Sequence, residues 1–365
     1  MKVLSITPTF APQLGGIEVV VQELALRLQD RGHQVDVAHV NSSHAQPSTD
    51  TMAGLTVHRV PLRGHRLAGW ASGLGELARG YDLLHVHDPQ LMAITANVRM
   101  QCAKVPAVLS THGGFHHTQQ MALFKALFEK LALKSMLSHY RLILASSVSD
   151  EAWFQRHSDR VVLCSNGVST DKFGVVPVDL DRPLHKWVYW GRLSRNKRVD
   201  KLIDAVAQAR HLGHPVELLV CGRDFDGIAD QLHQQTARLN LGDVVKFEPF
   251  LPDDALLQTL RQYGVYTTAS EHEGFGLSIV EAMAAGMQVM CRDMSPLNTF
   301  VQSGVTGRFL AFDGGAADAS ALQALLQQGS VERAQGRAHA RQTADQYNWD
   351  AAAERFEACF RQVLT

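Results

Sequence analysis

The chain lacks the features that would indicate a disulfide-stapled, zinc-binding or membrane-spanning protein. Five cysteines occur in 365 residues. Their odd number and the absence of a CxxC spacing argue against a disulfide framework or a cysteine zinc site and indicate reduced thiols. No run of about 18 apolar residues is present, which excludes a membrane-spanning helix. The apolar stretch after Met1 and Lys2 is too short for a signal peptide, so we expect a cytoplasmic protein.

An excess of charge of one sign is missing as well. Lys and Arg number 35 and Asp and Glu number 36, so the overall charge does not favour nucleic-acid binding, and any anion site must be local. The GxGxxG fingerprint of dinucleotide-binding domains is absent where it would be expected, which argues against a dehydrogenase. With 45% apolar and 19% charged residues, the chain is typical of a globular protein, and its length suits two domains.

Short apolar runs alternate with helical patterns along the whole chain, which is typical of parallel sheets built from βαβ units. The expected strands of the first half are 3–7, 35–40, 83–86, 107–111, 142–145 and 161–164. Those of the second half are 187–190, 216–221, 244–247, 265–268 and 288–291. The main helices are expected at 17–31, 199–212 and 278–285.

A proline-bearing stretch, Val175–His185, interrupts this pattern and is interpreted as a linker. The fold class is therefore α/β, with two doubly wound, Rossmann-like domains at residues 1–178 and 186–345. We expect residues 346–365 to form a helix that crosses back to the first domain, anchored by Trp349 and Phe356, although these aromatics could equally pack within one domain. Ligands of such sheets bind beyond the carboxyl ends of the strands, so a shared site is expected in the interdomain cleft.

A glycine-rich loop follows the first strand and leads directly into a helix. Gly15 and Gly16 would let the backbone approach a phosphate, and the helix that follows offers free N–H groups and a positive dipole end. A simple turn without a ligand has the same pattern.

The segment after the strand 265–268 carries two carboxylates, Glu273 and Glu281, separated by seven residues. Carboxylates accept hydrogen bonds from sugar and ribose hydroxyls, and backbone N–H groups of a glycine-rich loop bind phosphate oxygens. This combination suits a polyhydroxylated ligand that carries an anion. The loop and helix start between the two glutamates are Gly274, Phe275, Gly276 and Leu277.

Two cations, Arg192 and Lys197, lie between the strand 187–190 and the next helix. Arg offers a bidentate fork and Lys a point charge, so together they can bind one diphosphate. Fixed cations at a departing diphosphate stabilise the transition state of sugar transfer. Arg195 and Arg198 fit a solvated basic loop better.

His112 follows the strand 107–111 and is expected to face the cleft, where it could orient a sugar hydroxyl. His116 and His117, further along the same loop, are candidates for contact with the acceptor. A lone histidine is more often structural, but its place at a strand end favours the site.

Two patterns that resemble metal sites are set aside, and we expect neither a metal nor a cofactor. Asp224-Phe225-Asp226 has the DxD spelling of metal-dependent transferases but lies in a polar loop after a buried strand. His85, His87 and Asp88 lie on or just past a buried strand without an evident further ligand. Arg192 and Lys197 would take the place of the metal.

Taken together, these motifs resemble the family-4 retaining glycosyltransferases of GT-B fold over essentially the whole chain. The resemblance rests on 15–18, His112-Gly113-Gly114, 165–169, Gly191-Arg192 with Lys197, the Glu273-x7-Glu281 signature and 347–350. Ser169 stands where an Asp is usual, and Arg198 where a Gly is frequent.

The resemblance implies a nucleotide-diphospho-sugar donor and a role for each motif. Gly16 would lend its N–H to the diphosphate, Arg192 and Lys197 would bind the phosphates, and Glu281 the ribose. Glu273 with the backbone of 274–276 would hold the donor sugar, and His112 would lie near the reacting centre. Such enzymes retain the anomeric configuration without an evident protein nucleophile.

The stretch 110–118 is most similar to bacterial exopolysaccharide mannosyltransferases, which implies GDP-mannose and a polyprenyl-diphosphate-linked or other saccharide acceptor. The segment 121–141 is amphipathic and basic and could lie on the cytoplasmic face of the inner membrane, although an internal helix with a solvated face explains it slightly better. A UDP-sugar-dependent transferase of lipopolysaccharide or glycolipid synthesis, a sugar-nucleotide epimerase and a catalytically silent binding protein remain as alternatives.

Overall fold

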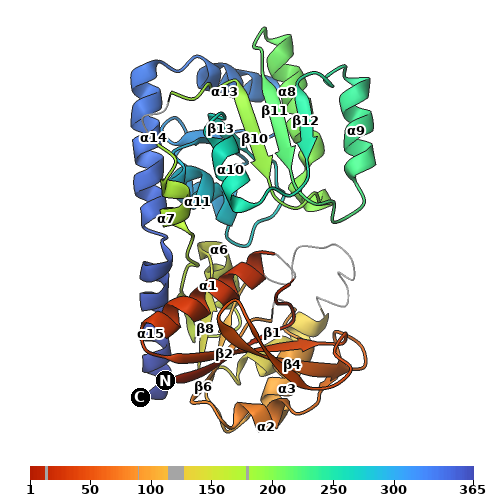
Figure 1. The fold of residues 1–365 in the computed structure, drawn as a ribbon, viewed down its shortest axis with the longest axis vertical. Coiled ribbons are helices and arrows are strands. Elements are labelled where there is room, and N and C mark those ends of the chain that lie inside the picture. The colour runs from red at the N-terminus through yellow and green to blue at the C-terminus, as the bar shows by residue number, and fades with distance from the viewer. Residues whose placement is uncertain (13–14, 89, 114–126, 178–180) are drawn as a thin grey trace. The chain divides into compact units, whose positions relative to one another are not determined.

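The computed structural model describes residues 1–12, 15–88, 90–113, 127–177 and 181–365 (Figure 1). Contacts divide the chain into two compact units: Met1–Gly167 with Trp349–Thr365, and Val168–Asn348. The change of unit falls before the linker expected from the prolines. It does so because helix α7 (Thr170–Gly174) places Phe173 in the core of the second unit.

The first unit contains one sheet in the order β3-β4-β2-β1-β6-β7-β8-β9, with β5 paired to β4. Most neighbours are parallel, but β3 and β5 pair with β4 in the antiparallel sense, which the strictly parallel expectation did not include. Burial is continuous along β6, β7 and β8, as a sheet covered on both faces requires. The strands are β1 (Lys2–Thr7), β2 (Gln34–Asn41), β3 (Ser48–Met52), β4 (Leu55–Arg63), β5 (Trp70–Ala71), β6 (Leu83–Val86), β7 (Ala107–Ser110), β8 (Leu142–Ala145) and β9 (Val161–Leu163).

Helices cover this sheet and include the C-terminal helix of the chain. Helix α15 (Trp349–Leu364) packs on α1 (Gly16–Asp30), and the Arg31 guanidinium pairs with Glu357 across 2.6 Å. Trp349 lies so close to Gly167 that a Cβ there would meet its ring at 2.3 Å, so only glycine fits. The remaining helices are α2 (Leu74–Ala78), α3 (Ala93–Gln101), a π-helical turn at Glu129–Leu133 continued by α5 (Lys134–Leu137), and α6 (Val148–Phe154).

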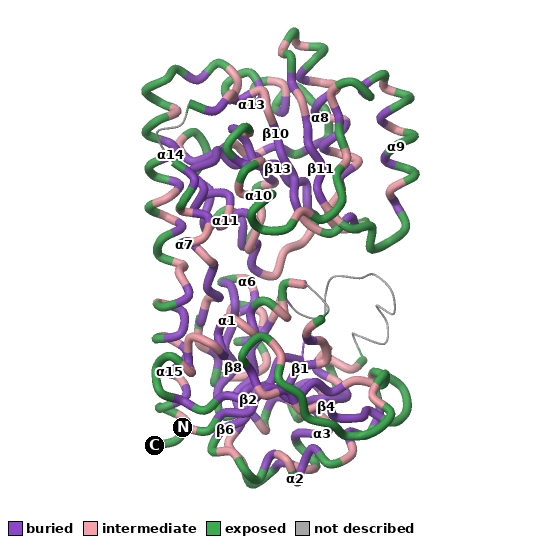
Figure 2. The backbone as a smooth tube through the Cα atoms, in the orientation of Figure 1, coloured by how far each residue is buried: buried purple, intermediate pink, exposed green. Residues whose placement is uncertain are grey.

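The second unit contains a wholly parallel sheet in the order β12-β11-β10-β13-β14-β15. Figure 2 shows β10 and β11 buried, whereas α9 is largely exposed. The strands are β10 (Lys186–Trp190), β11 (Glu217–Cys221), β12 (Val245–Glu248), β13 (Val265–Thr267), β14 (Gln288–Cys291) and β15 (Gly307–Phe309). The helices are a 3-10 turn at Arg195–Lys197, α8 (Val199–His211), α9 (Ala229–Arg238), α10 (Asp253–Leu260), α11 (Leu277–Ala284), α12 (Leu297–Phe300), α13 (Ala316–Leu326) and α14 (Ser330–Asp345).

Each sheet reverses its strand order at one point, and the loops at the carboxyl ends of the two strands there are the ones expected to bind a ligand. In the first sheet the chain builds outward on both sides of the pair β1 and β6, and in the second on both sides of β10 and β13. Loops that leave the carboxyl ends of such a pair diverge to opposite faces and open a crevice for a ligand. In the part of the chain that the structure describes, no helix is long and apolar enough to cross a membrane.

Candidate active site

Two loops of the second unit meet at its switch point. One follows β10 and carries Arg192 and Lys197; the other follows β13 and carries Glu273. The Asn196 amide donates to the carbonyl of His272 at 2.9 Å, and the Glu271 N–H donates to the carbonyl of Asn196 at 2.9 Å. The strand order therefore joins segments that lie 76 residues apart in sequence.

Lys197 and Glu273 form an ion pair across this junction. The ammonium Nζ lies 2.6 Å from Glu273 Oε1, and only 18% and 11% of the two side chains are exposed. A pair this well shielded from water interacts more strongly than a surface pair. The structure thus brings together a predicted cation and a predicted carboxylate, and each would be oriented by the other before a ligand arrives.

Glu281 is held by an aromatic residue that the sequence analysis did not select. The indole Nε1–H of Trp190 donates to Glu281 Oε2 at 3.1 Å. Burial raises the pKa of Glu281, while the Trp190 hydrogen bond and the charge of Lys172 lower it. Buried Tyr266 packs against Trp190 with 4.4 Å between ring centroids. Burial raises its pKa most, and the charges of Glu273 and Glu281 add to this, so both carboxylates act on one region.

Arg192 lies directly after β10, with its guanidinium 4.9 Å from the ring centroid of Phe225. Its carbonyl accepts the hydroxyl of buried Tyr189 at 2.8 Å, which fixes the loop backbone. The neighbouring Arg198 pairs instead with Asp200 and Glu271. It therefore supports the loop, in keeping with a role outside the proposed site.

The segment between the two glutamates forms a tight entry to α11. Gly276 has φ +95°, a left-handed conformation that glycine adopts readily. Phe275 is buried with its ring 5.1 Å from that of Phe300, so it anchors the loop in the core. Leu277 begins α11, whose first N–H groups are without a side-chain cap in the described residues and can serve an anion.

In the first unit, Gly15 and Gly16 lie where β1 hands over to α1. Side chains from β4 and β2 hold the loop after β1 in place. The Arg59 guanidinium donates to the carbonyl of Ala11 at 3.2 Å, and the Asn41 amide donates to the carbonyl of Pro8 at 2.9 Å. Gly15 is the N-cap, and a Cβ there would meet the Glu18 carboxylate at 2.6 Å. The Glu18 carboxylate is the end of a flexible side chain that can move aside, so this contact alone does not require glycine at position 15.

His112 follows β7 and hydrogen-bonds a second histidine from the neighbouring strand β6. Its Nε2 lies 2.9 Å from Nδ1 of fully buried His87. Burial lowers the pKa of His112 to about 4, so the ring is neutral at pH 7. The carboxylate of Asp150 accepts the Gly113 N–H at 3.0 Å, the Ser146 hydroxyl at 3.0 Å and the Thr111 hydroxyl. Asp150 therefore fixes the backbone on both sides of His112.

Three residues near the candidate groups escaped the sequence analysis: Trp190, His87 and Asp150. Trp190 ends a buried strand and has the pattern of a core residue. His87 was considered only as a metal ligand. Asp150 follows the helix cap Ser147 and reads as a first-turn acid. Their position at or after the ends of strands was the only sequence signal that pointed to them. Their contacts are with residues on other elements, and the sequence does not show those contacts. His116 and His117, with Gly114, lie outside the described residues.

The groups set aside as metal ligands have other partners. Asp224 accepts the N–H groups of Ile228 and Ala229 at 3.0 Å each, and Asp226 accepts the Arg195 N–H at 2.8 Å. Asp88 accepts the N–H and the hydroxyl of Thr95 at 2.9 and 2.8 Å. These carboxylates therefore shape turns and a helix start.

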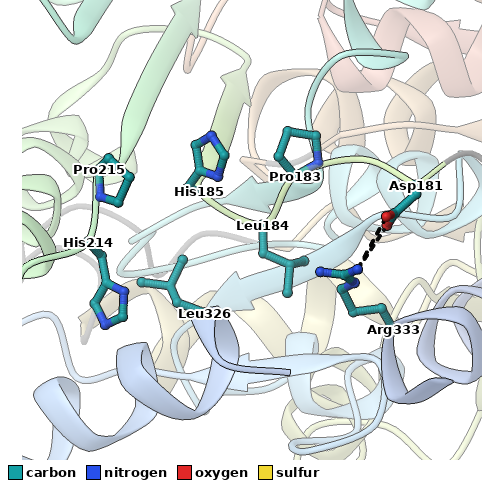
Figure 3. Close-up of a pocket in the computed structure, with 8 residues that line it drawn as sticks. All are labelled: Asp181, Pro183, Leu184, His185, His214, Pro215, Leu326 and Arg333. Carbon is teal, nitrogen blue, oxygen red and sulfur yellow. Dashed lines mark hydrogen bonds and ion pairs between the residues drawn. The ribbon is translucent and has the colours of Figure 1, made fainter. Parts of the chain in front are cut away.

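The second unit also contains a pocket away from these residues. A pocket of about 330 Å³ is lined by Asp181, Pro183, Leu184, His185, His214, Pro215, Leu326 and Arg333 (Figure 3). His185 precedes β10 and Pro215 precedes β11, so this pocket lies at the amino ends of the strands. Arg192 and Glu273 follow the carboxyl ends, at the opposite edge of the sheet, and the pocket is therefore separate from the candidate site.

Comparison with known proteins matches both halves of the chain. Residues 14–172 fit the model of Glycosyltransferase Family 4, and residues 181–343 fit that of Glycosyl transferases group 1. A GDP-mannose:cellobiosyl-diphosphopolyprenol alpha-mannosyltransferase of Komagataeibacter xylinus is 27% identical over 100% of this chain and 94% of its own length. A phosphatidyl-myo-inositol mannosyltransferase of Mycolicibacterium smegmatis is 26% identical over 100% of this chain and 94% of its own length.

Solved structures show the same architecture. Anabaena HepE in complex with UDP and glucose superposes with a TM-score of 0.77, at 20% identity, over 99% of both chains. The sucrose-phosphate synthase of Thermosynechococcus elongatus gives 0.77 at 21% identity, over 99% of this chain and 98% of its own. The two doubly wound sheets are thus those of the GT-B fold. The chain belongs to the glycosyltransferases that combine a family 4 N-terminal domain with a group 1 C-terminal domain.

Proposed function

We propose that this enzyme transfers mannose from GDP-mannose to a saccharide carried on a polyprenyl diphosphate, in the synthesis of a bacterial cell-surface polysaccharide. The similarity to the GDP-mannose:cellobiosyl-diphosphopolyprenol alpha-mannosyltransferases carries the proposal. It extends over 98–100% of this chain in relatives from Komagataeibacter and Xanthomonas. Similarity of that extent covers both units.

The candidate residues bind different parts of the donor. Arg192 and Lys197 bind the diphosphate, with backbone N–H groups of Gly15, Gly16 and the start of α11. Glu281 accepts the ribose hydroxyls. Glu273, with the loop Gly274, Phe275, Gly276 and Leu277, accepts hydroxyls of the sugar, and His112 lies at the reacting centre. The apolar packing of Phe275 and the Lys197–Glu273 pair supports these positions by holding the loop in place.

The transfer breaks the bond between the anomeric carbon and the diphosphate oxygen and forms one to the acceptor oxygen. The acceptor hydroxyl attacks from the face that the diphosphate leaves, so the anomeric configuration is retained, and its proton passes to the departing phosphate oxygen. Negative charge grows on that diphosphate, where Arg192 and Lys197 stabilise it more than in the bound substrate. No protein nucleophile takes part.

Incubation with GDP-[14C]mannose and an acceptor of cellobiosyl diphosphopolyprenol tests the proposal, with transfer into the lipid fraction as the readout. Glu273→Ala and Lys197→Ala should each lower kcat/KM by at least about 100-fold. Lys201→Ala, which removes a surface lysine paired with Asp204, is the control and should retain full transfer. Absence of transfer from GDP-mannose would reject this donor, and near-normal turnover in both site variants would reject the site.

A UDP-sugar is the second candidate donor, because HepE, which shares the fold, was solved in complex with UDP and glucose. Parallel reactions with UDP-glucose and UDP-galactose on the same acceptor separate the two. A thermal-shift series with GDP, UDP and ADP also separates them, because a ligand that binds the folded state alone raises the melting temperature.

We further propose that the first unit rests on an anionic membrane while it binds the lipid-linked acceptor. Leu127 and Leu131, one helical turn apart, are 56% and 70% exposed, and Lys130 and Lys134 lie beside them. Exposed leucines flanked by lysines suit insertion among acidic headgroups. Leu127→Glu with Leu131→Glu should abolish co-sedimentation with phosphatidylglycerol vesicles, whereas Val331→Glu, at an equally exposed residue of the second unit, should not. Equal binding by all three proteins would refute it.

A further inference from the structure

Three histidines lie side by side where β6 and β7 end in the first unit. His85 belongs to β6, His87 follows it, and His112 follows β7. His85 and His87 are completely buried, with ring centroids 4.0 Å apart, and His87 and His112 stack at 5.1 Å. The proposed transfer uses only His112. It gives no role to the buried pair His85 and His87 next to it.

Either His87 or His112 could be the donor in the hydrogen bond between them. Burial lowers the pKa of His85 to about 3 and of His112 to about 4, and that of His87 lies well below its usual range. All three rings are therefore neutral at pH 7, and each carries one N–H and one bare nitrogen. Across the 2.9 Å between His87 Nδ1 and His112 Nε2, only one of the two nitrogens is the donor.

The rest of the His87 ring decides the direction. Among the described residues, His87 Nε2 is buried without a hydrogen-bond partner. If His112 donated, His87 would have to carry its proton on Nε2, and a buried N–H would be left unpaired. If His87 donates from Nδ1, Nε2 is a bare acceptor, which proteins tolerate better than an orphaned N–H.

The neighbouring ring obeys the same rule. His85 Nε2 lies 2.7 Å from the Ser110 hydroxyl, and its Nδ1 has no partner in the part of the chain that the structure describes. The proton therefore belongs on His85 Nε2, toward Ser110. His85 hydrogen-bonds Ser110 and not His112, although it is buried to the same extent as His87. It is a matched control.

We propose that His87 is a positioning residue that fixes His112 as the Nδ1–H tautomer. With Nε2 occupied by the His87 proton, the proton of His112 must be on Nδ1. His112 then offers the substrate a hydrogen-bond donor and not a base. In that state it donates to an oxygen of the donor sugar or of the departing diphosphate, and cannot accept the acceptor's proton through either nitrogen. This inference rests on the proposed place of His112 at the reacting centre.

The tautomer is visible directly in the protein without any substrate. Long-range 1H–15N spectra of the 15N-histidine-labelled full chain distinguish a protonated from a bare ring nitrogen, and the pattern lost in His112→Gln identifies His112 among the 18 histidines. We expect Nδ1 of His112 to carry the proton in the wild type and in His85→Asn. A proton on Nε2 of His112 in the wild type overturns the proposal, whatever donor the enzyme uses.

Variants of His87 connect the tautomer to catalysis. Asn can place an amide N–H where Nδ1–H was, whereas Asp offers only acceptor oxygens when ionised and so draws a proton from His112 Nε2. We expect His87→Asp to move the proton of His112 and lower kcat by about 10-fold or more, while GDP affinity, measured by calorimetry, changes less than about twofold. His87→Asn should restore both the Nδ1–H pattern and most of kcat.

The two readouts keep failures apart. If His87→Asp changes the tautomer but leaves kcat unchanged, the catalytic part of the proposal is wrong. If no donor supports turnover, the proposed function fails while the spectra of the free protein still decide the tautomer. If His87→Asp does not fold, the wild-type spectrum and His87→Asn carry the test.

Discussion

Neutralising both members of the Lys197–Glu273 pair separates its structural role from its chemical one. Lys197→Met alone leaves Glu273 charged, with 11% of its side chain exposed and its partner at 2.6 Å removed. Losing one member of a buried pair costs about 3–5 kcal/mol, and partial exposure reduces this to about 2–3 kcal/mol. Glu273→Gln strands the lysine in the same way and should cost about the same.

The double variant Lys197→Met with Glu273→Gln leaves no unpaired charge. Its free energy of unfolding should return to within about 1 kcal/mol of the wild type, a coupling of about 3 kcal/mol or more. By thermal unfolding, each single variant should melt about 4–10 °C lower, and the double variant should recover most of that difference.

Activity should follow a different pattern from stability. The lysine that stabilises the leaving diphosphate is absent from the double variant, so kcat/KM should stay at least about 100-fold below the wild type, although the fold is restored. Initial rates with labelled GDP-mannose on the same preparations measure this. If the double variant regains activity together with stability, the pair merely ties the two loops together, and Lys197 has no part in the chemistry.

Three further predictions follow from single contacts. Trp190→Phe removes a hydrogen-bond donor to Glu281 and raises the pKa of that carboxyl further. At pH 7 the free energy of unfolding, measured by urea titration, should fall by about 1–2 kcal/mol. Near pH 4 the loss should be smaller, because the carboxyl is then largely protonated in both the folded and the unfolded protein. An equal loss at both values would contradict this. Asp150→Asn removes the charge that accepts the Gly113 N–H and should lower kcat about 10-fold, with GDP affinity by calorimetry unchanged; unchanged kcat would show that the loop holds without it. Gly167→Ala drives a Cβ to within 2.3 Å of Trp349 and should cost about 2–3 kcal/mol in thermal unfolding, whereas Gly174→Ala, which meets nothing within 4 Å, is its control; equal melting temperatures would refute the clash.

Buried strands were the most predictable elements. The strands 83–86, 142–145 and 288–291 have the expected bounds, because each is an apolar run that ends at a polar or turn residue. The strand β4 was missed, since His58, Arg59 and Pro61 interrupt the apolar residues of Leu55–Arg63, although most of the strand is buried. Its antiparallel partner β3 is mostly exposed and has no apolar pattern to detect.

The order of apolar and polar residues along the chain determined the two doubly wound domains, and the residue types at the strand ends determined that glycines, cations and glutamates would gather there. Those features are local, so they can be read from neighbours in sequence. Tertiary structure alone decided which of these groups touch. Lys197 meets Glu273, Trp190 meets Glu281 and His87 meets His112 because β10 lies beside β13, and β6 beside β7. Hydrogen-bond partners and burial depend on that lateral order of strands, which no single segment encodes.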